Sequence, residues 1–249
     1  ETLSEVPEGQ SVIFSAHGTA PDVFKEAKKK NLHIIDATCP LVTKVHRAAL
    51  RYSKRNVQTV LIGHHGHQEL VGTSGYIKDE LRFIVETEED VDKLKVDPNK
   101  EIGYLTQTTL SVTETQGIIN KLKLKYPHIQ GPKKADICFA TTNRQNAVVE
   151  LADFCEVIII CGSPNSSNSN RLKETAIEKG VEGYIIDKAQ EFKPEWIQGK
   201  KVVGISSGAS VPKFIVDQLV KKIKEIIPTV SIHEKETIEK GINFKIPNI

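Results

Sequence analysis

Two cysteines stand in polar segments that are far apart in the sequence. Cys39 lies in DATCPLVTKVH and Cys138 lies in DICFATTNRQ. A thiolate at a strand end is stabilised by backbone N–H groups and helix N-termini, and it binds soft metals or iron–sulfur clusters. The alternative is that both are buried free cysteines, the usual state of a thiol in a reduced protein. Cys155 and Cys161 flank the apolar run EVIII and are predicted to belong to the core, although GSPNSS follows Cys161 directly.

A second group of reactive residues consists of histidines in glycine-containing segments. His17 stands in SAHG, whereas His64, His65, His67 and Glu69 stand in GHHGHQE. Imidazoles in such loops can donate hydrogen bonds to an anion, and a carboxyl group beside them can supply or relay a proton. A zinc site is one alternative, but no HExxH helix or third spaced ligand pair accompanies these residues. Histidines that only face solvent are the other alternative.

Small polar side chains gather in two further segments, SSNSN over residues 166–170 and SSGAS over residues 206–210. Hydroxyl and amide groups at a helix N-terminus bind phosphate together with the helix dipole. Such segments also serve as ordinary turns and helix caps. Because the sequence contains neither GxxxxGK[ST] nor GxGxxG, a ligand smaller than a nucleotide, such as a diphosphate, is favoured.

The elements that must position these residues alternate between short apolar strands and helices, which predicts parallel sheets covered by helices. Nearly all of the unusual segments follow a strand and precede a helix, where α/β sheets bind ligands. We predict three such units around a central cavity. The first comprises residues 1–39 joined by a C-terminal tail over 223–249, the second 40–134 and the third 135–222. The helix after Cys138 is predicted over residues 143–154.

Composition excludes several classes of function. The formal net charge of the 249 residues is +2, so no global field favours nucleic acid. No apolar run is long enough to span a membrane, and four cysteines without framework spacing favour a reducing, cytoplasmic compartment. The chain contains no methionine, which predicts that it begins inside a longer polypeptide.

The ordered set of motifs resembles one enzyme family over essentially the whole chain. The motifs are SAHG, DATCPLVTKVH, GHHGHQELVGTSG, TQTTLSV, DICFATTNRQ, SSNSNRL and GASVP. They occur in the order seen in 4-hydroxy-3-methylbut-2-enyl diphosphate reductases of the non-mevalonate isoprenoid pathway. The resemblance implies three α/β units around a cavity that holds a 4Fe–4S cluster. It also implies reductive loss of an allylic hydroxyl, which gives isopentenyl and dimethylallyl diphosphate.

The resemblance assigns roles to individual residues. Cys39 and Cys138 match two of three cysteines that hold the cluster, and the third is expected upstream of this chain. Glu69 matches the acid that supplies a proton, and Thr108 matches the hydroxyl that orients it. The implied contacts to the substrate are His17, His67, Thr108, Ser166, Ser167, Asn168 and Ser210. The implied partners are the allylic diphosphate and an electron donor such as ferredoxin or flavodoxin, without nucleic acid or membrane.

Two other functions fit part of the pattern. A truncated, non-catalytic module could bind diphosphate through the same loops and contain no iron. A metal-dependent hydrolase could use His64, His67 and Glu69, and it would then contain stoichiometric zinc. The resemblance favours the reductase over both.

Overall fold

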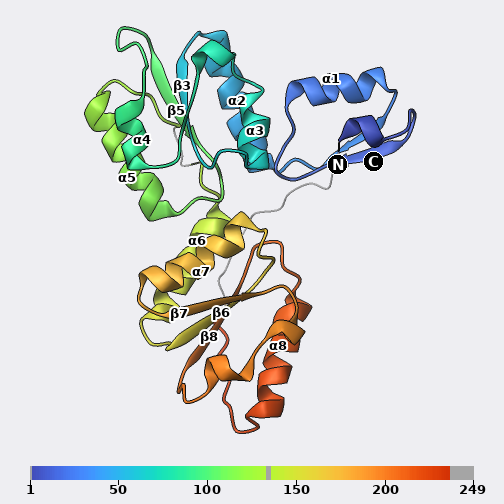
Figure 1. Cartoon of the computed structure of the whole chain (residues 1–249), viewed down its shortest axis with the longest axis vertical. Coiled ribbons are helices and arrows are strands. Elements are labelled where there is room, and N and C mark those ends of the chain that lie inside the picture. Colours follow the sequence, from blue (N-terminus) through green and yellow to red (C-terminus); the bar gives the residue numbers. More distant parts are fainter. Residues whose placement is uncertain (1, 133–135, 236–249) are drawn as a thin grey trace. The chain divides into compact units, whose positions relative to one another are not determined.

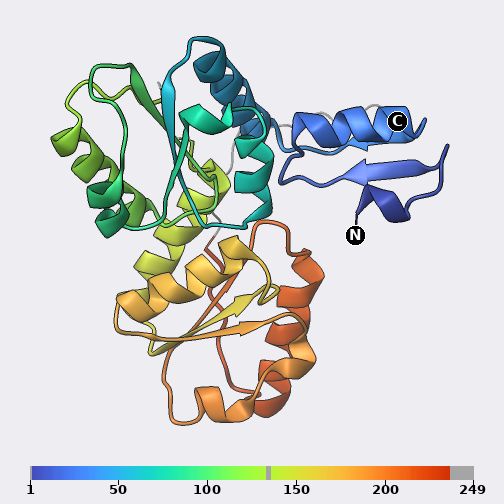
Figure 2. The same cartoon turned by 45° about the horizontal axis from the view of Figure 1, so that its top comes forward.

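The computed structural model describes residues 2–132 and 136–235. Within these residues the strands form three parallel sheets, of two, three and three strands, and helices connect consecutive strands (Figures 1 and 2). The prediction of three α/β units with parallel sheets is therefore confirmed.

The first sheet carries the SAHG and DATCP segments at the carboxyl ends of its strands. Its elements are β1 (Ser11–Phe14), α1 (Pro21–Lys29) and β2 (His33–Asp36), preceded by the 3-10 turn η1 (Leu3–Glu5). Pro21 occupies the first position of α1, where a missing N–H leaves no hydrogen bond unmade. Phe14 pairs with Asp36, so both strands end at the same edge. The loops that hold His17 and Cys39 therefore begin side by side.

The second sheet has the strand order β4-β3-β5. Its strands are β3 (Gln58–Ile62), β4 (Arg82–Val85) and β5 (Ile102–Thr106). The helices around it are α2 (Pro40–Lys54), α3 (Gln68–Ser74), α4 (Glu88–Lys93) and α5 (Val112–Lys125), with the 3-10 turn η2 (Asp79–Leu81). The middle strand β3 is buried at every residue, as expected where helices cover both faces of a parallel sheet.

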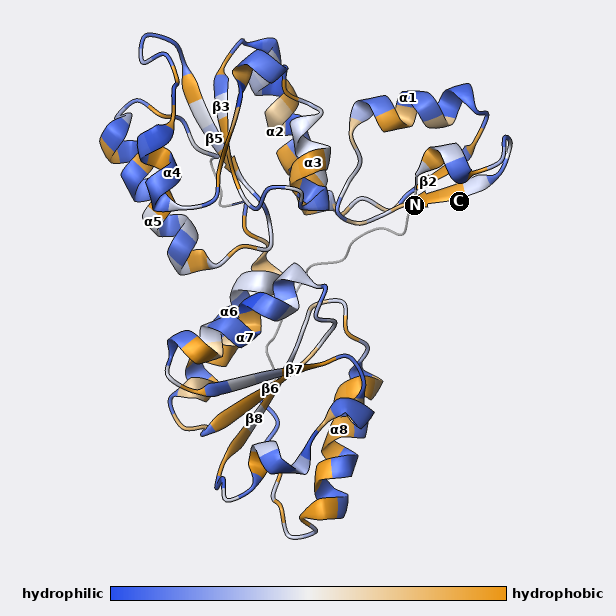
Figure 3. Cartoon of the chain, viewed as in Figure 1, coloured by the Kyte–Doolittle hydropathy of each residue, from blue (hydrophilic) through white to orange (hydrophobic). Residues whose placement is uncertain are grey.

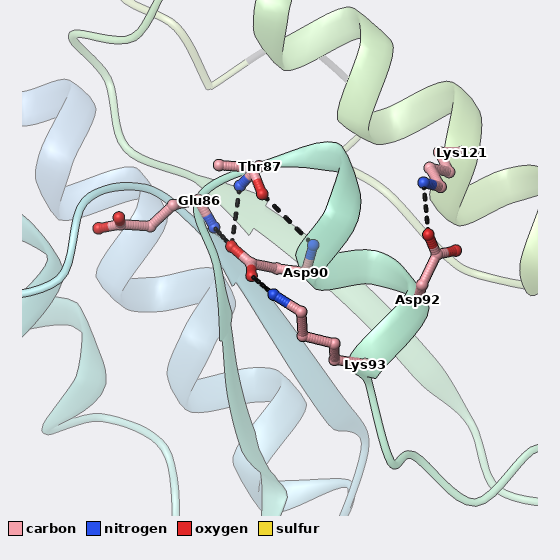
Figure 4. Close-up of polar contacts among 6 residues, drawn as sticks. All are labelled: Glu86, Thr87, Asp90, Asp92, Lys93 and Lys121. Carbon is pink, nitrogen blue, oxygen red and sulfur yellow. Dashed lines mark hydrogen bonds and ion pairs between the residues drawn. The ribbon is translucent and has the colours of Figure 1, made fainter.

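Polar contacts fix the outer helices of this sheet (Figure 4). The Thr87 hydroxyl accepts a hydrogen bond from the Asp90 amide at 3.3 Å, and the Asp90 carboxylate accepts one from the Thr87 amide at 3.1 Å. This capping box starts α4. Lys121 of α5 lies 2.7 Å from Asp92 of α4 and links the two helices. Glu86, whose amide donates to Asp90 at 3.2 Å, also accepts a hydrogen bond from the His65 amide, so this network reaches the loop after β3.

The third sheet has the strand order β7-β6-β8. Its strands are β6 (Val157–Cys161), β7 (Glu182–Ile186) and β8 (Val203–Ser207). Its helices are α6 (Phe139–Ala152), α7 (Ser167–Glu178) and α8 (Lys213–Ile226), with the 3-10 turns η3 (Ala189–Glu191) and η4 (Pro194–Ile197). The middle strand β6 is buried throughout and is coloured as hydrophobic in Figure 3. Its side chains supply two apolar clusters, one on each face of the sheet.

The described residues divide into two compact units. We call residues 2–108, 112–132 and 136–137 the N-terminal unit, which contains the first two sheets. We call residues 109–111 and 138–235 the C-terminal unit, which contains the third sheet. The boundary expected at 134/135 and the end of the tail expected to join the first unit, residues 236–249, lie outside the described residues.

Candidate active site

His17 and His67 form a pair in the N-terminal unit. Their ring centroids are 5.7 Å apart and their planes are nearly perpendicular. His67 is the N-cap of α3, and its Nδ1 accepts a hydrogen bond from the Glu69 amide at 3.2 Å. An accepting Nδ1 carries no proton, so Nε2 of the neutral ring is a donor. Burial, with the neighbouring His17 and His64 rings, lowers the pKa of His67 to about 4, in agreement with a neutral ring.

Glu69 and Thr108 form the second constellation of this unit. Thr108 follows β5, and its amide donates to Oε1 of Glu69 at 2.7 Å while its hydroxyl donates to Oε2 at 2.9 Å. Only 2% of Glu69 is exposed. Burial raises the pKa of Glu69 to about 7, although both hydrogen bonds from Thr108 lower it. The carboxyl group is therefore fixed in orientation and is poised to exchange a proton near neutral pH.

Close packing holds α3, which follows the segment of His64, His65 and His67, against the SAHG loop. A Cβ added to Gly72 of α3 would lie 2.8 Å from the carbonyl oxygen of Gly18, so no larger residue fits between them. Tyr76 also donates to the carbonyl of Thr19 at 3.3 Å. These contacts between two different sheets explain why His17 and His67 meet although 50 positions separate them.

Gln107 is a residue of this site that the sequence reasoning missed. It is 1% exposed, and its side-chain oxygen accepts a hydrogen bond from the His64 amide at 3.2 Å. It thereby ties the loop after β3 to the loop after β5, which holds Thr108. Its position inside the TQTTLS motif was the available signal.

A second buried carboxylate lies at the end of β5. Asp136 is 3.2 Å from the ammonium group of Lys44 and accepts a hydrogen bond from the Thr106 amide at 3.4 Å. Burial raises the pKa of Asp136, while Lys44 lowers it. The charge of Asp136 in turn adds to the rise in the pKa of Glu69. Asp136 is the first residue of the DICFATTNRQ segment, and the sequence alone did not predict a role for it.

Cys39 is half-buried and is the N-cap of α2. Its amide donates to the carbonyl of Ala16 at 3.0 Å, which places it against the SAHG loop. Cys138 is likewise half-buried and is the N-cap of α6. The prediction that the following helix begins at residue 143 was wrong, because α6 already begins at Phe139. The polar Thr and Asn side chains lie within its first turns rather than in a loop.

The other two cysteines are core residues. Cys161 is fully buried and Cys155 is 6% exposed, each within an apolar cluster of the third sheet. Burial raises the pKa of the Cys161 thiol to about 11 and also raises the pKa of Cys155. A buried thiol of this kind is neither a reactive nucleophile nor a ready metal ligand.

In the C-terminal unit, the N-terminus of α7 presents a group of small polar side chains. Ser166 is the N-cap, and its hydroxyl accepts from the Ser169 amide at 3.3 Å. Ser167 accepts a hydrogen bond at 3.0 Å from Thr109, which the sequence reasoning did not select. Both polar atoms of the buried Asn168 side chain lack a hydrogen-bond partner within the described residues. An unsatisfied buried amide is costly, and a bound polar ligand would relieve that cost.

The loop after β8 lies beside the same helix end. A Cβ added to Gly208 would be 2.4 Å from the Ser169 hydroxyl and 3.7 Å from the Asn168 amide nitrogen, so only glycine allows this approach. Ser210 is in this loop and is exposed. Four of the sequence-predicted residues therefore belong to one unit, where Ser166, Ser167 and Asn168 start α7 and Ser210 lies in the adjacent loop after β8.

The two half-buried cysteines, Cys39 and Cys138, are of a residue type that can bind an iron–sulfur cluster. Two half-buried thiols at the N-termini of long helices are suited to thiolate ligation, because the helix ends stabilise negative charge. No three His, Cys, Asp or Glu side chains converge as a metal-binding group in the part of the chain that the structure describes. Glu69 and His67, which the hydrolase alternative requires as ligands, are engaged by Thr108 and by the Glu69 amide instead.

Among residues 2–132 and 136–235, no helix has the length and apolar character to cross a bilayer.

The chain is similar to one group of known proteins. A family model described as LytB protein matches residues 1–224. The 4-hydroxy-3-methylbut-2-enyl diphosphate reductase of Vibrio parahaemolyticus is 49% identical over 252 residues, covering 99% of this chain and 79% of that protein. The same-named protein of Mannheimia succiniciproducens is 47% identical with the same coverage. The solved structure of the E-1-hydroxy-2-methyl-but-2-enyl-4-diphosphate reductase from Plasmodium falciparum matches with a TM-score of 0.92 at 35% identity, over 99% of this chain and 78% of that one.

Proposed function

The chain belongs to the LytB family, and from this premise we propose that it reduces 4-hydroxy-3-methylbut-2-enyl diphosphate to isopentenyl and dimethylallyl diphosphate. Replacing the allylic C–OH by C–H takes up two electrons and two protons and releases water. The observation that carries the proposal is the buried Glu69 carboxyl group, held by Thr108 with a pKa of about 7. A substrate hydroxyl leaves as water only if such a group delivers a proton to it.

The diphosphate is proposed to bind to His17, His67, Ser166, Ser167, Asn168 and Ser210. His67 contributes an N–H donor from Nε2, because its Nδ1 is occupied by the Glu69 amide. The side-chain amide of Asn168 has no hydrogen-bond partner within the described residues, which supports the binding of a polar ligand at the N-terminus of α7. The helix dipole favours an anion there. Hydrogen bonds to a charged ligand contribute about 1.5–3 kcal/mol each, so a few of them suffice to hold the substrate.

Glu69 is proposed as the proton donor and Thr108 as the group that orients it. In the ionised state, both oxygens of Glu69 accept hydrogen bonds from Thr108. In the protonated state, the Thr108 hydroxyl can accept the proton and pass its own towards the leaving oxygen. A positioned acid of this kind contributes roughly two to four orders of magnitude to turnover. The burial of Glu69 excludes water that would otherwise compete for the proton.

Cys39 and Cys138 are proposed as ligands of a 4Fe–4S cluster. When bound, the cluster supplies the electrons for the reduction and takes them from a carrier such as ferredoxin or flavodoxin. Because Cys155 and Cys161 are core thiols, neither is proposed as the third cysteine, and none of these 249 residues is assigned to that role. We propose that the third cysteine precedes them in the full-length protein, and that this protein acts in the cytoplasm.

The test is anaerobic iron and sulfide analysis with an absorption spectrum, followed by turnover with reduced methyl viologen as electron donor. The N-terminally extended protein should contain a 4Fe–4S cluster and convert the substrate, and Cys39→Ser or Cys138→Ser should abolish the cluster. Cys155→Ser is the matched control and should keep it. Full iron content in the Cys138→Ser protein contradicts the ligand assignment. Stoichiometric zinc without visible absorption would instead indicate a hydrolase, and diphosphate binding without iron would indicate a binding module.

A further inference from the structure

Helix α2 carries only positive charge, in contrast to the nearly balanced chain. Its sequence PLVTKVHRAALRYSK contains four Lys or Arg residues and no Asp or Glu, whereas the whole chain has a formal net charge of +2. Helix α4, which follows β4 of the same sheet, has the opposite character, with four acidic residues in EEDVDK. The positive charge is therefore a local property of α2.

Four residues of α2 form one exposed face, which we call the α2 face. They are Arg47, Leu50, Arg51 and Lys54. Residues three and four positions apart lie on the same side of a helix, so these four are contiguous. Leu50 is 40% exposed at the centre, surrounded by the three cations.

The cations of the α2 face are not used inside the described part of the chain. Lys44 and the C-capping Arg55 are paired, with Asp136 and Glu101 respectively. By contrast, within the described residues Arg47, Arg51 and Lys54 form no ion pair and no side-chain hydrogen bond. Their charge is therefore available to a partner.

The surface beside the α2 face is hollowed. A groove of about 210 Å³ is lined by the polar residues Asp36, Thr38 and Thr43, and by Phe24 of α1, Arg47, Leu50 and the stacked rings of His46 and Tyr76. The groove joins Leu50 to residues of the first sheet, and its lining is mixed, with one carboxylate, Asp36, among the apolar and cationic side chains. A partner with a protruding apolar side chain and an acidic surround would match both features.

We propose that the α2 face is the docking surface of an acidic, one-electron carrier protein. The inference rests on the proposed function, which requires two electrons from outside the molecule for each substrate. The first residue before α2 is Cys39, a proposed cluster ligand, and Arg47 lies roughly 12 Å from it along the helix at a rise of 1.5 Å per residue. A carrier bound to this face is thus near the acceptor of its electron. Positive charge opposite an acidic partner also accelerates encounter in a salt-dependent way.

The experiment uses the full-length, cluster-loaded protein and a plant-type 2Fe–2S ferredoxin as the acidic probe. The dissociation constant is measured by calorimetry at low and at high ionic strength, for the wild type and for the Arg47→Glu/Arg51→Glu variant. The variant should bind about ten- to a hundredfold more weakly, and the salt dependence should become shallower. A matched variant, Lys179→Glu/Lys193→Glu, reverses two exposed lysines of the C-terminal unit and should bind as the wild type does.

Turnover separates this inference from the proposed function. With ferredoxin as donor, the α2 variant should lose at least tenfold in rate, whereas the rate with reduced methyl viologen should stay within twofold of the wild type. An unchanged dissociation constant, or an equal loss in the matched variant, overturns the docking surface. Displacement of ferredoxin by a short duplex DNA of equal affinity overturns it as well, since the face would then bind polyanions in general. Absence of methyl viologen turnover in the wild type would instead refute the proposed function.

Discussion

Thr108 holds both carboxylate oxygens of Glu69, one through its amide at 2.7 Å and one through its hydroxyl at 2.9 Å. Thr108 lies in the loop after β5, and Glu69 lies in the first turn of α3, which follows the adjacent strand β3. Each hydrogen bond favours the ionised carboxylate, yet burial outweighs both and raises the pKa to about 7. Glu69 is therefore rigidly held and close to half-protonated at neutral pH.

Replacing Glu69 by Gln should change how stability depends on pH. In the folded wild type the proton is retained up to about pH 7, whereas the unfolded chain loses it near the ordinary value of 4.5. The free energy of unfolding should thus fall as the pH rises from 4.5 to 7, by roughly 3 kcal/mol for a shift of this size. The Gln variant lacks this contribution. Urea denaturation of both proteins across this range tests it, and parallel pH curves would contradict the raised pKa.

Replacing Thr108 by Val should shift the pH dependence of turnover. The variant keeps the amide donor to Oε1 but loses the hydroxyl donor to Oε2, a bond that favours the ionised form. The pKa of Glu69 should rise by roughly one unit, so the loss of turnover at alkaline pH should begin at a higher pH. The maximal rate should fall less than in Glu69→Gln, because the acid itself remains. The pH profile of kcat in the full-length enzyme measures both effects, and an unmoved alkaline limb would refute the role of the hydroxyl.

His67 should take up a proton when diphosphate binds. Its pKa of about 4 in the free protein reflects burial and two neighbouring imidazoles, and an anion beside the ring would raise it. The added proton goes to Nδ1 and replaces the hydrogen bond from the Glu69 amide. Affinity for inorganic diphosphate should therefore increase as the pH falls towards 6. The increase should exceed the change that protonation of the diphosphate itself causes. Calorimetry in buffers with different ionisation enthalpies counts the protons. His67→Asn is the control, since asparagine also caps a helix but does not titrate in this range. Equal proton uptake in both proteins would exclude His67.

Replacing Asn168 by Ala should separate binding from stability. The amide forms no hydrogen bond within the described residues, so its removal should change the free energy of unfolding by no more than about 1 kcal/mol. Diphosphate affinity should fall by roughly ten- to a hundredfold, the value of one charge-assisted hydrogen bond. Binding of the unphosphorylated alcohol should be unaffected. A large loss of stability together with unchanged affinity would identify Asn168 as a purely structural residue.

Much of the fold was predictable because the local signals agree with one another. The apolar runs around Val60 and Ile159 are buried strands, and the segments of His17, Cys39, His67, Ser166 and Ser210 follow strands as predicted. The strand expected just before Cys138 was wrong within the described residues, where α5 is followed directly by α6. The error at α6 has a local cause. Thr141, Thr142 and Asn143 favour turns when read alone, but α6 begins at Phe139 and includes them in its first turns, with the Thr142 amide donating to the Cys138 carbonyl at 2.9 Å. The contact of His17 with His67, by contrast, joins two sheets and has no sequence signature.

The chemistry available at each loop follows from residue type, which fixes whether a side chain can donate a proton, bind a metal or hold an anion. Apolar runs and helix caps are local patterns, and they place most of these loops at strand ends, although no strand precedes Cys138 within the described residues. The proton affinity of Glu69 and the tautomer of His67 depend instead on tertiary packing. The tertiary structure likewise revealed Gln107 and Asp136 as supporting residues. Burial and hydrogen bonding depend on which distant segments pack together, and that information is absent from any single stretch of sequence.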